Sequence, residues 1–309
     1  MIDHADENYT WDTIPEFTEE LEGAEYFSND GSAVYLQYIP DVVYSVKDNT
    51  ELHLQIIRPT LYFEPEKIYP IVILIKGSAW LKQEMYTDIP MFAKLAERGF
   101  IVAVMEYRHS GIAKFPAQNI DAKNAIRFMR AHAAEYCGDP DNIFLMGGSS
   151  GGHVAVVTGM TLDSDLYDEP DSDVPAEING IIDMYGPMEM TIPYAFPINT
   201  MQGKPGTPEY ELLGFDMNEH PERMAPLLGK TYLDHTFAPM LIIHGTKDRM
   251  CNFEQTKRFY NDMKAAGKDV RLVVIRGADH GGSAFWCKEA LDVYEGFIRE
   301  HLKQSENRN

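Results

Sequence analysis

Short apolar runs alternate with longer amphipathic stretches along most of the chain. Two segments of alternating polarity, residues 34–46 and 52–58, predict a hairpin-like pair of edge strands. Further along, runs of branched aliphatic residues predict buried strands, and the periodic stretches between them predict helices. The predicted strands cover residues 71–75, 100–106, 142–147, 178–184, 239–243 and 270–275, and the predicted helices cover residues 86–98, 118–137, 150–161 and 252–268.

This alternation predicts an α/β fold with a mostly parallel central sheet and helices on both faces. Residues 163–177, rich in Asp and Pro, predict a surface insertion, and residues 187–236 break the rhythm with Pro, Met, Tyr and Gly. We expect residues 187–236 to form a small cap over the site. Five residues of this expected cap either line a ligand pocket or pack the cap onto the domain: Met188, Met190, Tyr194, Phe196 and Met201.

The beginning of the chain differs in character from the remainder. Residues 1–31 are acidic with scattered aromatic side chains, and no Lys or Arg occurs before Lys47. We expect an N-terminal arm over residues 1–31 that either packs over the domain or contacts a partner subunit. Residues 32–309 are expected to form one catalytic domain, because α/β folds of this size are often single units.

Composition and cysteine usage narrow the class of protein. The chain is 44% apolar and 24% charged, which is ordinary for a globular protein. It has no run of about eighteen apolar residues and no signal-peptide layout at its start, so we expect a cytoplasmic protein. Cys137, Cys251 and Cys287 are odd in number and far apart, which predicts reduced thiols without a disulfide framework or a metal site. No cofactor is expected, and Cys251 is expected to be a small buried thiol.

The net charge of -21 opposes binding to nucleic acid or to an anionic membrane surface. The charge is also uneven, since no Lys or Arg occurs between Arg130 and Lys204. That gap covers much of the expected substrate rim, which therefore lacks the groups that grip carboxylates or phosphates. A neutral small molecule fits this rim better than an anionic substrate. The sequence leaves open whether the chain forms a homo-oligomer.

The residues that follow the strand at 142–147 carry the strongest functional signal. Gly147-Gly148-Ser149-Ser150-Gly151 fits G-x-S-x-G, the nucleophile elbow that exposes a serine on a sharp strand-to-helix turn. The pattern also fits when read one residue later, with Ser150 at its centre. Because the strand ends near Met146, the elbow geometry favours Ser149 as the nucleophile. Ser150 would then be the first helical residue and offer its N–H to an oxyanion.

The elbow predicts an acid and then a histidine further along the chain. Asp248 and His280 each lie just beyond the C-terminal end of a predicted strand, at the sheet edge where sites form in open α/β sheets. We therefore expect Ser149, Asp248 and His280 to form a catalytic triad, with Asp183 as the alternative acid. Three nearby residues fit less well: His153 on the helix leaving the elbow, His244 as a core histidine, and Asp279 beside His280.

The loop after residues 71–75, Lys76-Gly77-Ser78-Ala79-Trp80, stands where this elbow type places its oxyanion hole. Here the chain resembles the α/β-hydrolase esterases related to hormone-sensitive lipase, and more closely their bacterial carbohydrate-esterase and feruloyl-esterase-like branch. That family carries H-G-G-G-W in this loop, so Lys76, Ser78 and Ala79 depart from it. The other matching stretches are Tyr107-Arg108, Phe115-Pro116-Ala117, Asp121-Ala122, Arg127, Asp139-Pro140, Ile143, Gly147 to His153, His244 to Asp248, and Gly277 to Gly281.

The resemblance covers roughly residues 50–302 and implies an α/β-hydrolase fold and ester hydrolysis. It assigns the oxyanion hole to the N–H groups of Ser78, Ala79 and Ser150, and we expect Trp80 to contact the substrate. The leading hypothesis is a serine carboxylesterase for short acyl esters, with acetyl or feruloyl esters of carbohydrates as the expected substrates. The alternatives are an acylaminopeptidase-like peptidase, an arylformamidase, or a hydrolase-fold binding module without catalytic activity.

Overall fold

The computed structural model describes residues 13–28, 34–60, 67–169, 173–193 and 202–304. The chain divides into two units, residues 1–33 and 34–309. In the first unit, the N–H of Ala24 donates to the carbonyl of Leu21 (3.1 Å), and the N–H of Leu21 donates to the hydroxyl of Tyr26 (2.6 Å). Three residues singled out in the expected cap, Tyr194, Phe196 and Met201, lie outside the described residues.

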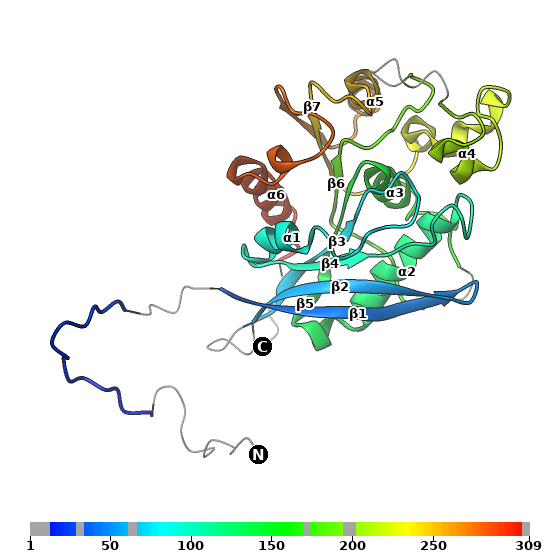
Figure 1. Cartoon of the computed structure of the whole chain (residues 1–309). Helices are drawn as coiled ribbons and strands as arrows, with labels where there is room; N and C mark the ends of the chain where they lie inside the picture. The colour runs from blue at the N-terminus through cyan, green and yellow to red at the C-terminus, as the bar shows by residue number, and fades with distance from the viewer. Residues whose placement is uncertain (1–12, 29–33, 61–66, 170–172, 194–201, 305–309) are drawn as a thin grey trace. The chain divides into compact units, whose positions relative to one another are not determined.

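The second unit is built on an eight-stranded sheet in the order β1-β2-β4-β3-β5-β6-β7-β8 (Figure 1). β1 pairs antiparallel with β2, β2 pairs antiparallel with β4, and all the remaining pairs are parallel. The strands are β1 (Tyr35–Lys47), β2 (Thr50–Thr60), β3 (Tyr69–Ile75), β4 (Ile101–Met105), β5 (Gly138–Gly148), β6 (Gly180–Met184), β7 (Met240–Gly245) and β8 (Val270–Ile275). The expected hairpin edge and mostly parallel sheet are both confirmed.

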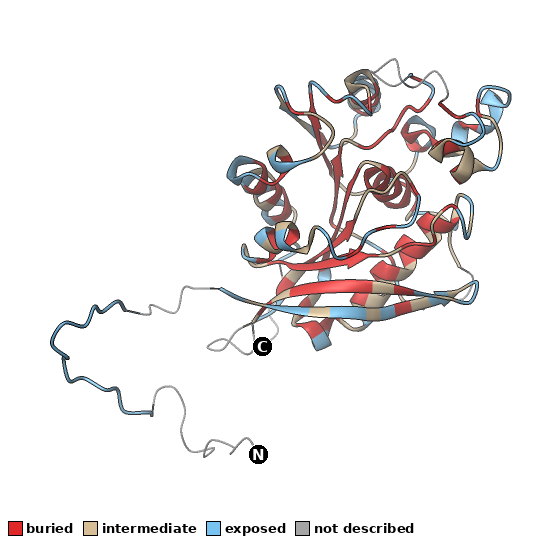
Figure 2. Ribbon diagram, viewed as in Figure 1, coloured by how far each residue is buried: buried red, intermediate tan, exposed pale blue. Residues whose placement is uncertain are grey.

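Helices cover both faces of this sheet, which is the α/β-hydrolase arrangement that the sequence predicts. One face carries α1 (Ile89–Ala96) and α6 (Lys288–Glu300), which contact each other. The other face carries α2 (Ala117–Ala131), α3 (Ser150–Gly159) and α5 (Phe253–Ala265). The strands between the two helical layers are buried almost throughout (Figure 2), because side chains on both of their faces pack against helices. Within the described ranges, no helix has the length and apolar content needed to cross a bilayer.

Some elements differ from the sequence prediction. The helix expected over residues 118–137 ends earlier, because α2 gives way to a 3-10 turn, η1 (Ala133–Tyr136), and Cys137 then adopts a left-handed conformation (φ 59°). The C-terminal helix α6 was not anticipated. The described part of residues 187–236 contains only short elements: α4 (Pro208–Leu213) and the 3-10 turns η3 (Pro221–Arg223), η4 (Ala225–Leu227) and η5 (Gly229–Tyr232). Met188 and Met190 are buried in the hydrophobic core.

Candidate active site

The turn between β5 and α3 holds Ser149 in a strained conformation. Its φ of 54° and ψ of -127° lie outside the regions that non-glycine residues normally occupy. Glycines make the sharp turn possible. A Cβ on Gly147 would lie 2.2 Å from the carbonyl oxygen of Gly151, and a Cβ on Gly151 would lie 2.0 Å from the carbonyl oxygen of Ile75. The close packing of these backbone segments holds Ser149 in its strained conformation, as strain at functional sites requires.

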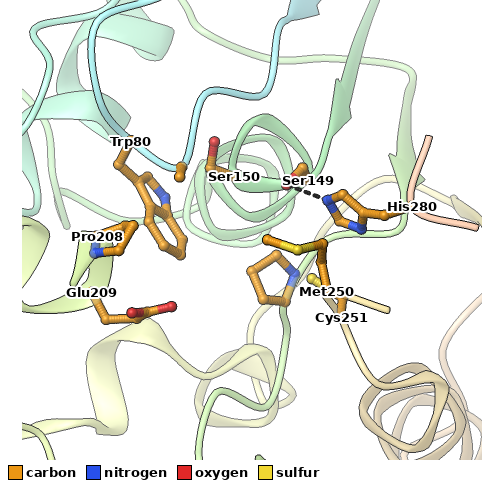
Figure 3. A pocket seen from close by; sticks show the side chains of 10 residues that line it. Trp80, Ser149, Ser150, Pro208, Glu209, Met250, Cys251 and His280 are labelled. Atoms are coloured by element: carbon orange, nitrogen blue, oxygen red, sulfur yellow. Dashed lines mark hydrogen bonds between the residues drawn. The ribbon is translucent and has the colours of Figure 1, made fainter. Parts of the chain in front are cut away.

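The structure brings Ser149, His280 and Asp248 together from three loops that follow β5, β8 and β7. The Nε2 atom of His280 lies 2.8 Å from Ser149 Oγ, and its Nδ1 atom lies 2.7 Å from Asp248 Oδ2. Figure 3 shows the contact between the serine and the imidazole. With Nδ1–H donating to the carboxylate, Nε2 is left to accept the hydroxyl proton. A histidine base can therefore act on this serine, and an acid holds its ring.

Asp248 is held by donors on both of its oxygens. Oδ1 accepts the backbone N–H groups of Met250 (2.7 Å) and Cys251 (2.8 Å). Oδ2 accepts His244 Nε2 (2.9 Å) as well as His280. Burial works to raise the pKa of this carboxyl, but the hydrogen bonds from His244 and His280 overcome burial and hold the pKa well below its usual range. Asp248 is consequently ionised wherever the fold is intact near neutral pH.

His244 was expected to be a core histidine, and it does lie fully buried at the end of β7. The sequence analysis missed its contact with Asp248. Its Nδ1 accepts the hydroxyl of Thr256 (2.6 Å), which leaves Nε2–H to donate to Asp248. The sequence signal that could have predicted this contact was the spacing, because His244 stands four residues before Asp248, across the turn that ends the strand. The sequence analysis also missed Tyr185. Its ring packs edge-on against the His280 ring, with 4.8 Å between the two ring centroids.

The competing residues lie elsewhere. His153 on α3 donates to the carbonyl of Leu227 (3.0 Å), and burial lowers its pKa to about 4. The hydrogen bond from Arg249 holds the pKa of Asp279 at about 2, and this carboxylate accepts the backbone N–H of His280. Asp183 accepts the N–H of Gly186 (2.9 Å). Within the described part of the chain, none of these three side chains makes a hydrogen bond to Ser149 Oγ or to the His280 ring.

The loop after β3 approaches the elbow as expected, but it supplies fewer donors than the sequence analysis assigned. The N–H of Ser78 donates to Ser150 Oγ (2.9 Å), so the prediction that it faces the oxyanion is wrong. The N–H groups of Ala79 and Ser150 have no acceptor among the described residues. Ala79 also takes a positive φ of 54°, as Ser149 does. Two residues with free backbone donors, Ala79 and Ser150, therefore line the same cavity as Ser149, whereas the N–H of Ser78 braces the loop.

The Ser78 side chain contributes to the same brace. Its hydroxyl donates to the carbonyl of Leu81 (2.6 Å) and lies 2.8 Å from the Tyr107 hydroxyl. Lys76, which replaces the histidine of the resembling family, turns toward Asp88 (2.7 Å) and the carbonyl of Glu84 (2.5 Å). Two of the three departures from the family pattern, Lys76 and Ser78, thus help to fix the position of the loop.

A cavity of about 140 Å³ opens above Ser149 and His280 (Figure 3). Trp80 lines it, and residues 187–236 contribute Pro187, Pro208 and Glu209. The described residues of its wall include no Lys or Arg, and they do not include Met188 or Met190. Cys251 also lines the cavity, and burial raises the pKa of its thiol well above the usual value. A neutral thiol is a poor nucleophile, so Cys251 does not compete with Ser149 as the candidate nucleophile.

The fold and this arrangement define an α/β hydrolase with a serine at the elbow. Residues 57–263 match the BD-FAE family. The chain belongs to this family, within the α/β-hydrolase esterases related to hormone-sensitive lipase.

Two relatives show how far the likeness extends. The probable carboxylic ester hydrolase LipM of Mycobacterium tuberculosis is 26% identical over 205 residues, which is 64% of this chain and 46% of LipM. The probable isoprenylcysteine alpha-carbonyl methylesterase ICME of Oryza sativa subsp. japonica is 25% identical over 260 residues, which is 79% of this chain and 58% of ICME. The chain spans about half the length of the curated relatives it matches.

Two solved structures are similar over nearly their full lengths. A truncated form of a carbohydrate esterase from gut microbiota has a TM-score of 0.73 and 26% identity, covering 88% of this chain and 98% of that one. The propionate-bound esterase Est2 of Thermogutta terrifontis has a TM-score of 0.66 and 26% identity, covering 88% of this chain and 96% of that one. Both neighbours are esterases by name.

Proposed function

We propose that this chain is a serine carboxylesterase that hydrolyses short acyl esters of neutral alcohols, above all acetylated sugars. The observation that carries the proposal is the contact series from Ser149 Oγ to His280 (2.8 Å) and from His280 to Asp248 (2.7 Å) beneath an open cavity. In this proposal, residues 32–309 are the catalytic domain, residues 1–31 are an acidic arm, and residues 187–236 are a cap beside the site.

The residues of the site act in sequence during the reaction. Ser149 Oγ attacks the ester carbonyl while His280 Nε2 takes its proton, and the N–H groups of Ala79 and Ser150 bind the oxyanion. His280 then gives the proton to the leaving alkoxide, so that the alcohol departs and an acyl-serine remains. Water hydrolyses the acyl-serine by the same two steps. Asp248 keeps Nδ1 protonated and stabilises the imidazolium ion, and its low pKa keeps the carboxylate charged throughout.

The cavity supports a small neutral substrate. Its volume of about 140 Å³ is below the roughly 300 Å³ at which pockets for drug-sized ligands begin. Its described wall offers no cation to an anionic ester. One structural neighbour is named as a carbohydrate esterase and another holds propionate, which agrees with a short acyl group and a sugar alcohol. A feruloyl ester is the alternative of larger acyl size.

A substrate series tests this proposal. We expect kcat/KM to fall from acetyl to butyryl to decanoyl p-nitrophenyl esters, and we expect hydrolysis of acetylated xylo-oligosaccharides. Ser149→Ala serves as the blank, with a loss on the order of 10⁴-fold or more because it removes the nucleophile. A preference for the decanoyl ester, with no activity on acetylated sugars, would overturn the substrate assignment.

A further inference from the structure

Glu209 is a buried acid in the wall of the active-site cavity. It lies in the first turn of α4 and is 1% exposed. Figure 3 shows its carboxyl extending into the cavity from the side away from His280, next to Pro208 and Trp80. Neither carboxyl oxygen accepts a hydrogen bond from any described residue. The cavity thus holds an unpartnered acid that the hydrolysis steps do not use.

Two other buried carboxyls in this protein are matched by cations. Asp121 receives several hydrogen bonds from Arg108, and Glu189 pairs with Lys230 at 2.6 Å. Burial raises the pKa of Glu209, and the backbone N–H groups of Glu209 and Gly203 oppose that rise without reaching hydrogen-bond geometry. Leaving a carboxyl buried and unpaired costs stability, and such groups in folded proteins call for a partner. A ligand in the cavity can supply that partner.

The surroundings of Glu209 indicate which ligand chemistry fits. Trp80 and Pro208 give the cavity apolar surfaces, and Trp80 Nε1 is also buried without an acceptor among the described residues. A hydroxyl group donates one hydrogen bond and accepts others, so it suits a wall that carries both acceptors and an unmatched donor. It is also neutral, so it enters an apolar cavity at less desolvation cost than an ammonium ion.

We propose that Glu209 binds a hydroxyl group of the substrate, outside the reacting ester bond, and thereby selects hydroxyl-bearing esters. The inference rests on the proposed function and assigns the recognition of the substrate to the same cavity. The hydroxyl belongs either to a sugar alcohol or to the acyl group. Both sources share the same chemistry, an O–H that donates to one carboxyl oxygen.

Four esters in two matched pairs test the inference. On the alcohol side, an acetylated methyl xyloside is compared with cyclohexyl acetate, and on the acyl side, methyl ferulate is compared with methyl 3,4-dimethoxycinnamate. Glu209→Leu should lower kcat/KM about 10- to 100-fold for the hydroxylated ester of one pair, mainly through KM, because one hydrogen bond to a charged group is lost. The hydroxyl-free partner should change by less than about threefold. The pair that responds identifies the source of the hydroxyl.

Controls separate binding from damage to the fold. Glu211 lies on the same helix with an exposed side chain outside the cavity wall, so Glu211→Gln should leave all four rates unchanged. Labelling of Ser149 by a serine-directed organophosphonate should proceed as fast in Glu209→Leu as in the wild type. If Glu209→Leu does not fold, the isosteric Glu209→Gln replaces it and should lose roughly half as many powers of ten, because its amide still accepts a neutral hydrogen bond.

Three results would overturn the inference. Equal losses on both members of each pair would show that Glu209 only supports the fold. A wild-type preference for acetylcholine over 3,3-dimethylbutyl acetate that disappears in Glu209→Gln would assign the carboxyl to a cation instead. Wild-type protein that hydrolyses none of the four esters and resists the organophosphonate would remove the proposed function, and this inference with it.

Discussion

The ends of two neighbouring strands, β6 and β7, place two aspartates in opposite electrostatic surroundings. Asp183 lies in β6 and Asp248 in the loop after β7, and both residues are buried, with 0% and 4% of their surface exposed. Asp248 receives four hydrogen bonds, two of them from histidines. Asp183 receives one, from the N–H of Gly186, and its Oδ2 has no partner among the described residues.

This difference in donors decides the charge of each group. The histidine contacts hold the pKa of Asp248 well below its usual range, whereas burial raises the pKa of Asp183 to about 7. Asp183 instead lies where the elbow packs tightly, since a Cβ on Gly152 would come within 2.4 Å of its Oδ1. Both aspartates are therefore candidates by their position near a strand end, and the converging donors favour Asp248 as the triad acid.

The largest expected effect comes from replacing the acid itself. Asp248→Asn should lower kcat on the order of 10⁴-fold, because the amide no longer holds His280 in the tautomer that accepts the serine proton. Steady-state kinetics on p-nitrophenyl acetate measure the loss. Asp183→Asn is the matched control, since the amide oxygen still accepts the N–H of Gly186, and its kcat should stay within a few-fold of the wild type. The reverse pattern would make Asp183 the acid.

A smaller effect should appear in the pH dependence of stability. Asp183 has a folded-state pKa of about 7 against 3.8 for a free side chain, so the folded state binds its proton more tightly. Below pH 3.8 the carboxyl is protonated in both states, so its ionisation does not affect the free energy of unfolding. Above pH 7 it is ionised in both states, and the folded state bears the full cost of burying the charge. The free energy of unfolding therefore falls as the pH rises between these values. Between pH 5 and pH 8.5, the advantage of Asp183→Asn over the wild type should grow by about 2 to 3 kcal/mol.

Urea unfolding of both proteins at the two pH values measures this double difference, in which the other titrating groups cancel. An advantage that is the same at pH 5 and pH 8.5 would show that Asp183 does not titrate in this window. The contrast between the raised pKa of Asp183 and the lowered pKa of Asp248 would then not hold.

The strands and the positions of the candidate triad residues could be predicted because local patterns determine them. Buried parallel strands are continuous apolar runs, and the loops after them carry Ser149, Asp248 and His280 in the order that the elbow demands. The same patterns found the hairpin of β1 and β2. They failed in detail where a helix ends, as at Cys137, because a single left-handed residue leaves only a weak trace in periodicity.

The residues that the sequence analysis missed depend on contacts between distant segments. The N–H of Ser78 meets Ser150 Oγ across 72 positions of the chain, so its loss to the oxyanion hole cannot be read from a motif. Glu209 stands in an acidic stretch of residues 187–236 that has no regular period, and only the structure shows its carboxyl at the cavity. Glutamate side chains are usually exposed, so the burial of this one depends on tertiary packing that the local sequence does not reveal.

Organophosphonate labelling followed by peptide mapping tests the central claim most directly, namely that Ser149 is a nucleophile activated by His280 and Asp248. Incubation of the wild-type protein should give one adduct per chain, on Ser149, and loss of ester hydrolysis in step with labelling. Asp248→Asn should be labelled far more slowly, and Ser149→Ala should not be labelled at all. An adduct on Ser150, or full ester hydrolysis by Ser149→Ala, would contradict the account.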